Sequence, residues 1–280
     1  MAERFPLRLF IFSGGLILAK FFTIASGSSG NSSFVGASGE GILVDCGISC
    51  RGITTALKNR DIDPDSLSGI LVTHEHIDHV RGLSVFLSHH NVPLYASAPV
   101  LRYLTSNGLV PFNAVLNEID EHGQLIGNML IKPFKTSHDS VGSLGYSIVT
   151  PDEHRISICT DTGYITEDAR EHLLGSETVL IESNYDSGML DFGPYPYHLK
   201  RRIKGPQGHL SNTDCAAFHP ELVKSGTMHI VLGHLSKENN TPEVALQTSV
   251  AELSMAGMKK DRDYTIFAAP RNELSENILL

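Results

Sequence analysis

Histidine and acidic residues crowd into one short segment, THEHIDHVRG (residues 73–82). The segment follows the apolar run GILV (69–72), which is typical of a buried strand, so it is predicted to lie on the loop at that strand's carboxyl end. Residues two positions apart in an extended chain point to the same side. The rings of His74 and His76 are therefore expected to project together from this loop.

Side chains that can bind metal ions occupy four of six successive positions in this segment: His74, His76, Asp78 and His79. A single tetrahedral ion seldom takes that many ligands from one loop. The natural inference is a site for two metal ions. Zinc suits a histidine-rich site, and carboxylate oxygens also accommodate Mn²⁺, so both metals remain open.

Strand-like apolar runs recur along the chain and would position such loops. Three of them end on, or just before, another histidine or aspartate: MLIKPFK (129–135), RISICTD (155–161) and MHIVLGH (228–234). A clear helix is predicted over 241–257, with Thr241 as its cap. The order of strands, mixed strands and helices, and strands again favours an α/β (α+β) domain of two packed sheets flanked by helices.

The first 18 residues differ from the rest of the chain. Positive residues precede an apolar stretch there, as in a signal peptide, but glycines interrupt the stretch and no clear cleavage site follows. We therefore predict a dispensable extension over 1–18 and one domain over 19–280, with export as the alternative. Four scattered cysteines are too few for a disulfide framework, which favours reduced thiols and a cytoplasmic location.

The segment THEHIDH resembles the HxHxDH signature of the metallo-β-lactamase superfamily. The resemblance implies a four-layer αββα sandwich that holds a two-metal hydrolytic site. It also implies three further ligands, in the order His, Asp, His, each at the end of a strand. The chain has candidates in that order at His138, Asp161 and His234.

Correspondence with this family divides the ligands between two ions. The first ion would be held by three histidines: His74, His76 and His138. The second ion would be held by an aspartate and two histidines: Asp78, His79 and His234. Asp161 would bridge the ions and fix their separation, while Asp78 would supply charge that retains the second ion, so both are predicted to take part in catalysis.

Four more segments resemble the bacterial YycJ/WalJ (VicX) group within this superfamily: ASGSSGNSS (25–33), ESNYD (182–186), GHLSN (208–212) and HLSKENN (234–240). Members of that group are metal-dependent single-domain nucleases associated with 5′→3′ exonuclease action on DNA. The segment YPYHLK (195–200) departs from the group's pattern. The polarity of cleavage and the choice between DNA and RNA therefore stay open.

Several residues outside the ligand set are candidates for contacting a phosphodiester. His209 could stabilise the phosphoryl group or protonate the leaving oxygen, and the alternative is a loop histidine without a role. The loop SGSSGN (26–31) has the composition of an anion cradle, and the basic segment HLKRRIKG (198–205) suits backbone phosphates or a solvated face. The candidate substrate contacts are Ser29, Asn31, Arg201, Arg202, Ser211, Lys237 and Asn239.

The net charge of −9 does not indicate a nucleic-acid binder, so such a role has to rest on local patches. We predict phosphodiester hydrolysis by a hydroxide that two metal ions activate, in a 5′→3′ exonuclease that prefers DNA to RNA. The alternative enzyme is a lactonase or thioesterase on the same scaffold. The alternative outside enzymes is a regulatory or nucleic-acid-binding protein with a degenerate site. The sequence predicts no membrane association and indicates no stable protein partner.

Overall fold

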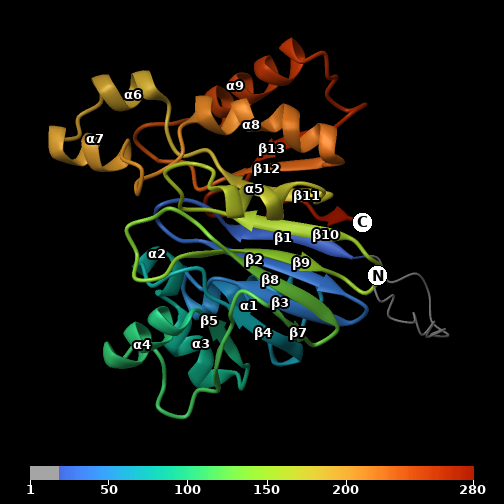
Figure 1. Ribbon diagram of the computed structural model, residues 1–280. Helices are drawn as coiled ribbons and strands as arrows, with labels where there is room; N and C mark the ends of the chain where they lie inside the picture. Colours follow the sequence, from blue (N-terminus) through green and yellow to red (C-terminus); the bar gives the residue numbers. More distant parts are fainter. Residues whose placement is uncertain (1–18) are drawn as a thin grey trace.

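The strands form two sheets, each with seven strands, within residues 19–280, the part of the chain that this computed structural model describes (Figure 1). The predicted extension over 1–18 lies outside the described residues. The first sheet has the strand order β14-β1-β2-β3-β4-β5-β6. Its strands are β1 (Lys20–Ala25), β2 (Ser32–Ala37), β3 (Glu40–Val44), β4 (Leu67–Leu71), β5 (Leu94–Ala96), β6 (Leu116–Glu118) and β14 (Ile278–Leu279).

The second sheet has the strand order β13-β12-β11-β10-β9-β8-β7. Its strands are β7 (Gln124–Ile126), β8 (Met129–Lys135), β9 (Leu144–Val149), β10 (Arg155–Cys159), β11 (Thr178–Glu182), β12 (His229–Gly233) and β13 (Thr265–Ala268). Strands β3 to β6 pair in parallel, and so do β10 to β13. The carboxyl ends of parallel strands meet at one edge of a sheet, which is where open α/β folds place their sites.

Helices cover the outer face of each sheet (Figure 1). The first sheet packs against α1 (Cys50–Lys58), α2 (Ile77–Val80), α3 (Leu83–His89) and α4 (Ala98–Ser106). The second sheet packs against α5 (Glu167–Leu173), α8 (Asn212–Ser225) and α9 (Pro242–Met255). The predicted four-layer αββα sandwich is confirmed. No helix within the described residues is both long and apolar enough to cross a bilayer.

The core between the sheets is apolar, and a hydrogen bond links the two sheets next to the THEHIDH loop. Side chains such as Phe21 and Ile42 from the first sheet pack against Ile131 from the second, and all three are fully buried. The hydroxyl of the buried Tyr146, on β9, donates a hydrogen bond of 2.6 Å to the carbonyl of Val72, just after β4. This bond fixes the loop of one sheet to a strand of the other.

Two helices that the sequence did not predict project from the sandwich, at the upper left of Figure 1: α6 (Ser187–Phe192) and α7 (Tyr197–Ile203). They share a small apolar cluster made by Tyr185, Leu190 and Ile203. Each is shorter than two turns, so neither has a helical apolar period long enough to detect. We call residues 187–204 the α6–α7 arm.

Side-chain caps set where two of the helices begin. Helix α1 starts at Cys50, because the Ser49 side chain accepts a hydrogen bond of 3.2 Å from Gly52 N. The helix predicted over 241–257 spans Pro242–Met255. The predicted Thr241 cap is confirmed, since its side chain accepts a hydrogen bond from Val244 N.

Candidate metal centre

The loop between β4 and α2 carries the first four candidate ligands to the edge where the two sheets meet. Its start is fixed by a buried hydrogen bond of 2.8 Å from Thr73 N to Asp45 Oδ1. His76 is the residue that caps α2. Asp78 and His79 lie within this short helix, and not on the loop that the sequence predicted over 73–82.

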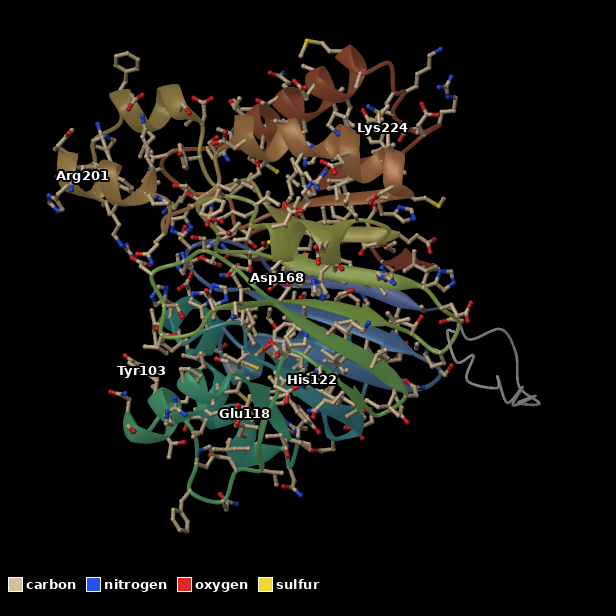
Figure 2. The ribbon with its side chains drawn as sticks, in the orientation of Figure 1. Tyr103, Glu118, His122, Asp168, Arg201 and Lys224 are labelled. Atoms are coloured by element: carbon tan, nitrogen blue, oxygen red, sulfur yellow. The ribbon has the colours of Figure 1, made fainter. Side chains whose placement is uncertain are left out.

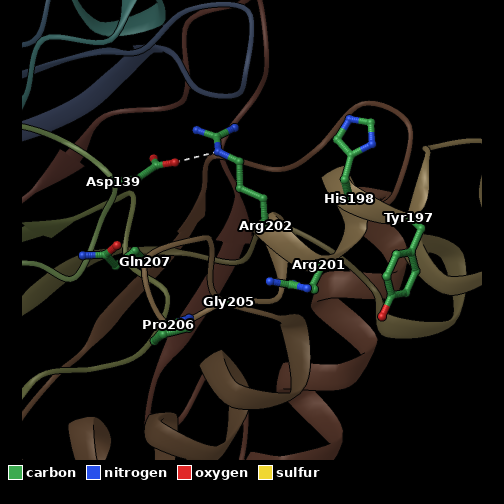
Figure 3. A pocket seen from close by; sticks show the side chains of 8 residues that line it. All are labelled: Asp139, Tyr197, His198, Arg201, Arg202, Gly205, Pro206 and Gln207. Carbon is green, nitrogen blue, oxygen red and sulfur yellow. Dashed lines mark hydrogen bonds and ion pairs between the residues drawn. The ribbon is translucent and has the colours of Figure 1, made fainter.

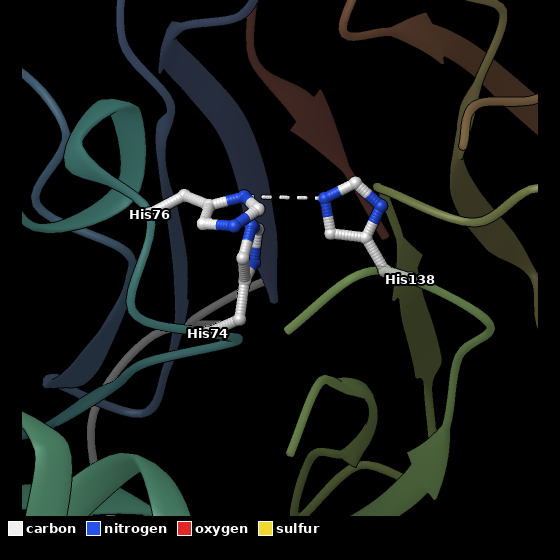
Figure 4. A group of neighbouring side chains, drawn as sticks. All are labelled: His74, His76 and His138. Atoms are coloured by element: carbon white, nitrogen blue, oxygen red, sulfur yellow. Dashed lines mark hydrogen bonds between the residues drawn. The ribbon is translucent and has the colours of Figure 1, made fainter. Parts of the chain in front are cut away.

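The first group of candidate ligands is made by His74, His76 and His138, whose nitrogen atoms lie within 4.8 Å of one another (Figure 4). His138 comes from the loop after β8. Its Nδ1 donates to the carbonyl of Gly208 at 3.0 Å, which leaves Nε2 as the free ligand atom. That Nε2 lies 3.2 Å from Nδ1 of His76.

The second group is made by Asp78, His79 and His234, and it is equally compact. Nε2 of His79 lies 3.6 Å from Oδ2 of Asp78, and Nε2 of His234 lies 3.5 Å from the same oxygen. His234 directly follows β12. One carboxylate and two imidazoles thus face one another across a small space.

Asp161 joins the two groups. Its side chain is 2% exposed, and Oδ2 lies 3.0 Å from Nε2 of His79. Its other oxygen, Oδ1, lies 3.0 Å from Nδ1 of His234 and 3.7 Å from Nε2 of His138. A carboxylate that reaches both groups occupies the place that the family pattern implied for a bridging ligand.

Three residues at this centre hold left-handed backbone conformations that side chains other than glycine rarely adopt. Asp45, Asp161 and His234 have φ angles of 63°, 57° and 52° and each follows a strand. Such conformations cost on the order of 1–3 kcal/mol each and persist where the surroundings enforce them. The abrupt turn after each strand directs the side chain into the centre.

Asp45, after β3, is a residue of this centre that the sequence reasoning missed. Its Oδ2 accepts hydrogen bonds from Nδ1 of His79 at 2.7 Å and from Oγ1 of Thr73 at 2.9 Å. Because Nδ1 of His79 carries the proton, Nε2 is left to act as a ligand atom. An aspartate at the end of an apolar run, the signal that drew attention to Asp161, would have found it.

Glu182, the last residue of β11, was also missed as a site residue. It is fully buried, and Oε1 accepts a hydrogen bond of 2.7 Å from Nδ1 of His209. Its other oxygen, Oε2, accepts from Thr162 N at 2.8 Å. A glutamate at the end of a fully buried strand is rare unless it has a charged or hydrogen-bonding partner. The position of Glu182 at the end of the apolar run TVLI was therefore the signal that could have identified it.

Burial and neighbouring charges set the protonation of the two groups differently. Burial lowers the pKa of His74 and of His138, so both rings are neutral, the form in which imidazole binds a metal. Burial would raise the pKa of Asp161, but His234 and His79 outweigh it and hold that pKa well below the usual value. In the second group burial is outweighed by the nearby carboxylates, which raise the pKa of His79 and of His234 well above the usual value, so a metal ion there would have to displace a proton.

The pKa of His209 is displaced in the opposite direction from those of His74 and His138. Burial lowers it, but the adjacent carboxylate of Glu182 outweighs burial and raises the pKa above the usual value. Burial alone would raise the pKa of Glu182, but the adjacent His209 outweighs burial and brings that pKa below its usual value. The pair is therefore an imidazolium beside a carboxylate.

Three buried polar atoms of the centre have no hydrogen-bond partner in the part of the chain described: Nε2 of His74, Oδ2 of Asp161 and Nδ1 of His234. The last two have close neighbours, but at angles unsuited to a hydrogen bond. Leaving such a group unpaired costs about 1–3 kcal/mol, so buried polar atoms are normally bonded. Two nitrogens and an ionised oxygen left unpaired in one place are a donor set that fits divalent cations.

The Gly/Ser loop lies beside the centre, but its backbone is already engaged. The amides of Gly27, Gly30 and Asn31 have acceptors within the protein, so they are not available to the anion that the composition suggested. Nδ2 of Asn31 lies 3.0 Å from Nε2 of His79, which places this side chain against a candidate ligand. Ser29 is exposed at the loop's tip.

The structure keeps three predicted contact residues away from the centre. Ser211 caps α8 and accepts a hydrogen bond of 3.0 Å from Asp214 N. Asn239 is fully buried beside Ser236, and Lys237 is exposed. None of these three lines the cleft over the centre, as the described residues delimit it.

The cleft over the centre has a volume of about 350 Å³. Candidate ligands and His209 form its floor, and Leu199, Arg202 and Ile203 of α7 form one wall. Arg202 therefore lines the cleft over the centre, whereas Arg201 lines a neighbouring cavity and not this cleft (Figure 3).

A family model described as the beta-lactamase superfamily domain matches residues 41–230. The chain belongs to the beta-lactamase superfamily. Exodeoxyribonuclease WalJ of Streptococcus pneumoniae is 36% identical over 251 residues, which cover 89% of this chain and 93% of WalJ. Exodeoxyribonuclease YycJ of Bacillus anthracis is 33% identical over 228 residues, which cover 80% of this chain and 85% of YycJ. These matches confirm the resemblance to the YycJ/WalJ group within the superfamily.

Solved structures of the superfamily share the fold. The metallo-beta-lactamase fold protein YhfI from Bacillus subtilis superposes with a TM-score of 0.67 at 15% identity, and the match covers 92% of this chain and 99% of YhfI. At that identity the likeness shows the fold alone. The predicted metallo-β-lactamase fold is confirmed.

Proposed function

We propose that this member of the beta-lactamase superfamily is a metal-dependent exodeoxyribonuclease. The observation that carries the proposal is the buried cluster in which Asp161 joins two groups of candidate ligands. The relatives WalJ and YycJ, which match most of the chain, bear the name exodeoxyribonuclease. A divalent-metal site and a phosphodiester substrate follow together from these two facts.

The proposed ligand set uses each group for one ion. His74, His76 and His138 would hold one ion, Asp161 would be shared, and the other ion would have Asp78, His79 and His234. The neutral rings of His74 and His138 and the ionised Asp161 are in the protonation states that Zn²⁺ or Mn²⁺ requires, whereas binding to His79 and His234 would release the protons that their raised pKa favours. The chemistry that divalent ions supply in such sites is activation of water and neutralisation of charge on the phosphoryl oxygens.

His209 is the proposed proton donor. Its Nδ1 is engaged by Glu182, so Nε2 is the nitrogen left to face the cleft that His209 lines. The raised pKa favours the protonated ring, which can donate to a phosphoryl oxygen or protonate the leaving oxygen. Glu182 acts as a positioning residue, because it sets the tautomer, charge and orientation of His209.

DNA is the proposed substrate, with cleavage from the 5′ end. DNA is supported by the names of the two relatives, and the 5′→3′ polarity by the family resemblance alone. Arg202 in the cleft wall suits a polyanion in a chain whose net charge is −9. The four cysteines are free, which agrees with the proposed cytoplasmic location.

The alternatives are less well supported. A lactonase or thioesterase would bind an uncharged acyl group, which gains little from a cationic His209 and from Arg202 in the wall. A regulatory protein with a degenerate site would lack ligands, whereas every position of the superfamily's ligand pattern is filled here. Both alternatives remain outcomes of the test below.

The test is digestion of end-labelled single-stranded and double-stranded DNA, and of RNA, with and without added Zn²⁺ or Mn²⁺. We expect a 5′ label to be released at once as a mononucleotide, while a 3′ label stays on shortening strands. DNA should be degraded faster than RNA. Hydrolysis of acyl substrates with no action on any nucleic acid would contradict the proposal.

A pair of histidine variants separates the site from general damage. His76→Ala removes a proposed ligand and should abolish digestion. His122→Ala removes an exposed histidine from the turn before β7 (Figure 2), which does not line the cleft over the centre, and should digest at the wild-type rate. Equal activity of the two variants would remove His76 from the proposed site.

A further inference from the structure

A second cavity lies against α7 and the loop that follows it (Figure 3). Its volume is about 560 Å³, which is within the range of small-molecule sites. Its lining comes from the α6–α7 arm, the loop after it and the loop that carries His138: Asp139, Tyr197, His198, Arg201, Arg202 and Gln207. Arg202 lines both this cavity and the catalytic cleft. The two spaces therefore share one wall.

The cavity is held in place relative to the proposed metal ligands. The loop over 205–208 forms its edge and is bonded to the loop of His138 at three points. Asp139 N donates to the carbonyl of Gln207 at 3.1 Å, and Oγ of Ser137 donates to that of Pro206 at 2.8 Å. The third bond is that of His138 itself, to Gly208 at 3.0 Å. A ligand in this cavity would be positioned directly against the catalytic cleft.

The basic residues of the arm are not equivalent. Lys200 donates to the carbonyls of Asp191 and Gly193, and Lys204 pairs with the Asp191 carboxylate, so both hold the arm together. Arg201 is exposed, and no acidic partner for it occurs among residues 19–280. Its guanidinium is free for an anion.

Arg202 is only partly engaged. Its Nε donates to Oδ2 of Asp139 at 2.6 Å, as the dashed line in Figure 3 marks. Its two terminal amino groups have no hydrogen-bond acceptor within the described part of the chain. A guanidinium held at one edge keeps its paired outer donors for a phosphate.

An aromatic ring adjoins Arg201. Tyr197 begins α7 and lies four residues before Arg201, on the same face of the helix, and it is 78% exposed (Figure 3). Free guanidinium groups next to an exposed ring are the combination that binds single-stranded nucleic acid, through phosphates and stacked bases.

We propose that this cavity is a nucleotide subsite for single-stranded DNA, next to the scissile phosphodiester. Arg201 binds the phosphate of the nucleotide in the subsite, Tyr197 stacks on its base, and Arg202 contacts the phosphate that passes from subsite to cleft. This inference rests on the proposed nuclease function and specifies how that site holds its strand. An unpaired base is required, because a duplex base is already stacked on both faces.

The test compares a long substrate with a short one. The long substrate is a 5′-phosphorylated oligothymidylate, which would fill the subsite, and the short one is bis(4-nitrophenyl) phosphate, which is too small to reach from the cleft into it. For Arg201→Gln and for Tyr197→Ala, we expect the ratio of kcat/KM for the two substrates to fall about tenfold, through a higher KM for the oligonucleotide. Tyr197→Phe keeps the ring and should restore the wild-type ratio.

Lys224→Gln is the matched control for charge. Lys224 is exposed near the end of α8, at the opposite end of the molecule from Arg201 (Figure 2), and its loss changes the net charge by the same amount. It should leave the ratio unchanged. In a plot of log KM for the oligonucleotide against the logarithm of salt concentration, the slope should become shallower by about one unit for Arg201→Gln and should stay unchanged for Lys224→Gln.

Three results distinguish failure of the subsite from an effect of bulk charge and from failure of the proposed nuclease function. If wild-type protein degrades the oligonucleotide but Arg201→Gln and Tyr197→Ala have the wild-type ratio of kcat/KM for the two substrates, the proposed subsite is wrong and the proposed nuclease function is unaffected. If Lys224→Gln lowers this ratio as much as Arg201→Gln does, the effect comes from the net charge of the protein and the proposed subsite is wrong. If wild-type protein hydrolyses the small diester but no DNA, the proposed nuclease function itself is wrong.

Discussion

The buried ligand cluster and the α6–α7 arm face the same cleft but are built in opposite ways. In the cluster, His79 and Asp161 are at most 2% exposed, and protein groups orient their ring nitrogens and oxygens. On the arm, Tyr197 is 78% exposed, and Arg201 has no acidic partner among the described residues. The cluster is preorganised by the protein, whereas the arm is completed by what it binds. Mutations in the first should impair metal binding and kcat, and those in the second should change KM.

The largest expected effect comes from the carboxylate that joins the two ligand groups. Asp161→Ala should reduce DNA hydrolysis to background and lower the bound metal, because it removes the oxygens that lie 3.0 Å from His79 and from His234. Digestion of labelled DNA and metal analysis by mass spectrometry are the measurements. Glu118→Ala, which removes an exposed acid on β6 (Figure 2), is the control. Normal digestion by a metal-depleted Asp161 variant would refute the mechanism.

Loss of His209 should slow the reaction without emptying the centre. Removal of a general acid typically costs about 10²- to 10⁴-fold in rate, so His209→Ala should lower kcat by that amount while metal content stays at the wild-type value. Glu182→Gln should show a smaller loss, because it weakens the orientation of His209 without removing it. A metal content that falls in parallel with kcat would make His209 a ligand instead.

A smaller effect on metal affinity is expected when the hydrogen bond that orients His79 is weakened. Asp45→Asn keeps the size of the side chain but weakens the 2.7 Å bond to Nδ1, and loss of such a partner typically costs about 10- to 100-fold in metal affinity. Competition with a coloured chelator measures that affinity. Asp65→Asn is a matched control, since Asp65 bonds to His90 at the same distance but is 64% exposed. Similar affinities for both variants would mean that Asp45 does not tune the ligand.

The smallest expected effect lies outside the site, at His219 on α8. This ring is fully buried, and burial lowers its pKa to about 3. In the unfolded chain the pKa is about 6.5. Below that pH the unfolded chain binds the extra proton, so stability falls as the pH drops from about 6.5 towards about 3.

His219→Leu should remove part of this dependence on pH. Urea titrations at pH values between about 6.5 and 4.5 should give a smaller fall in the free energy of unfolding than in the wild type, with kcat unchanged. The result would show that burial alone keeps this histidine neutral, whereas the carboxylates of Asp45 and Asp161 raise the pKa of the equally buried His79. An identical fall in both proteins would mean that other groups set the acid stability.

The fold and the ligand cluster could be predicted from the sequence because short local patterns determine both. Apolar runs such as GILV mark strands, and THEHIDH follows one of them. Candidate ligands from distant strands then meet because parallel strands end at the same edge. His138, Asp161 and His234 lie next to the opening motif for that reason.

The supporting residues could not be predicted because their role depends on contacts between distant segments. Asp45 and Glu182 are ordinary acids in the sequence until His79 and His209 lie beside them. The α6–α7 arm has two short helices, so no apolar period indicates its position. Predicted contacts such as Asn239 follow from resemblance to a segment, and burial of that side chain separates it from the cleft.

The measurement that tests the central claim most directly combines metal content with activity on one sample. Purified full-length protein is stripped with a chelator, its metal per chain is counted, and hydrolysis of 5′-labelled single-stranded DNA is followed before and after Zn²⁺ or Mn²⁺ is returned. We predict about two ions per active chain, no hydrolysis after stripping, and recovery on addition of either metal or of one of them. Full hydrolysis by metal-free protein would contradict the account.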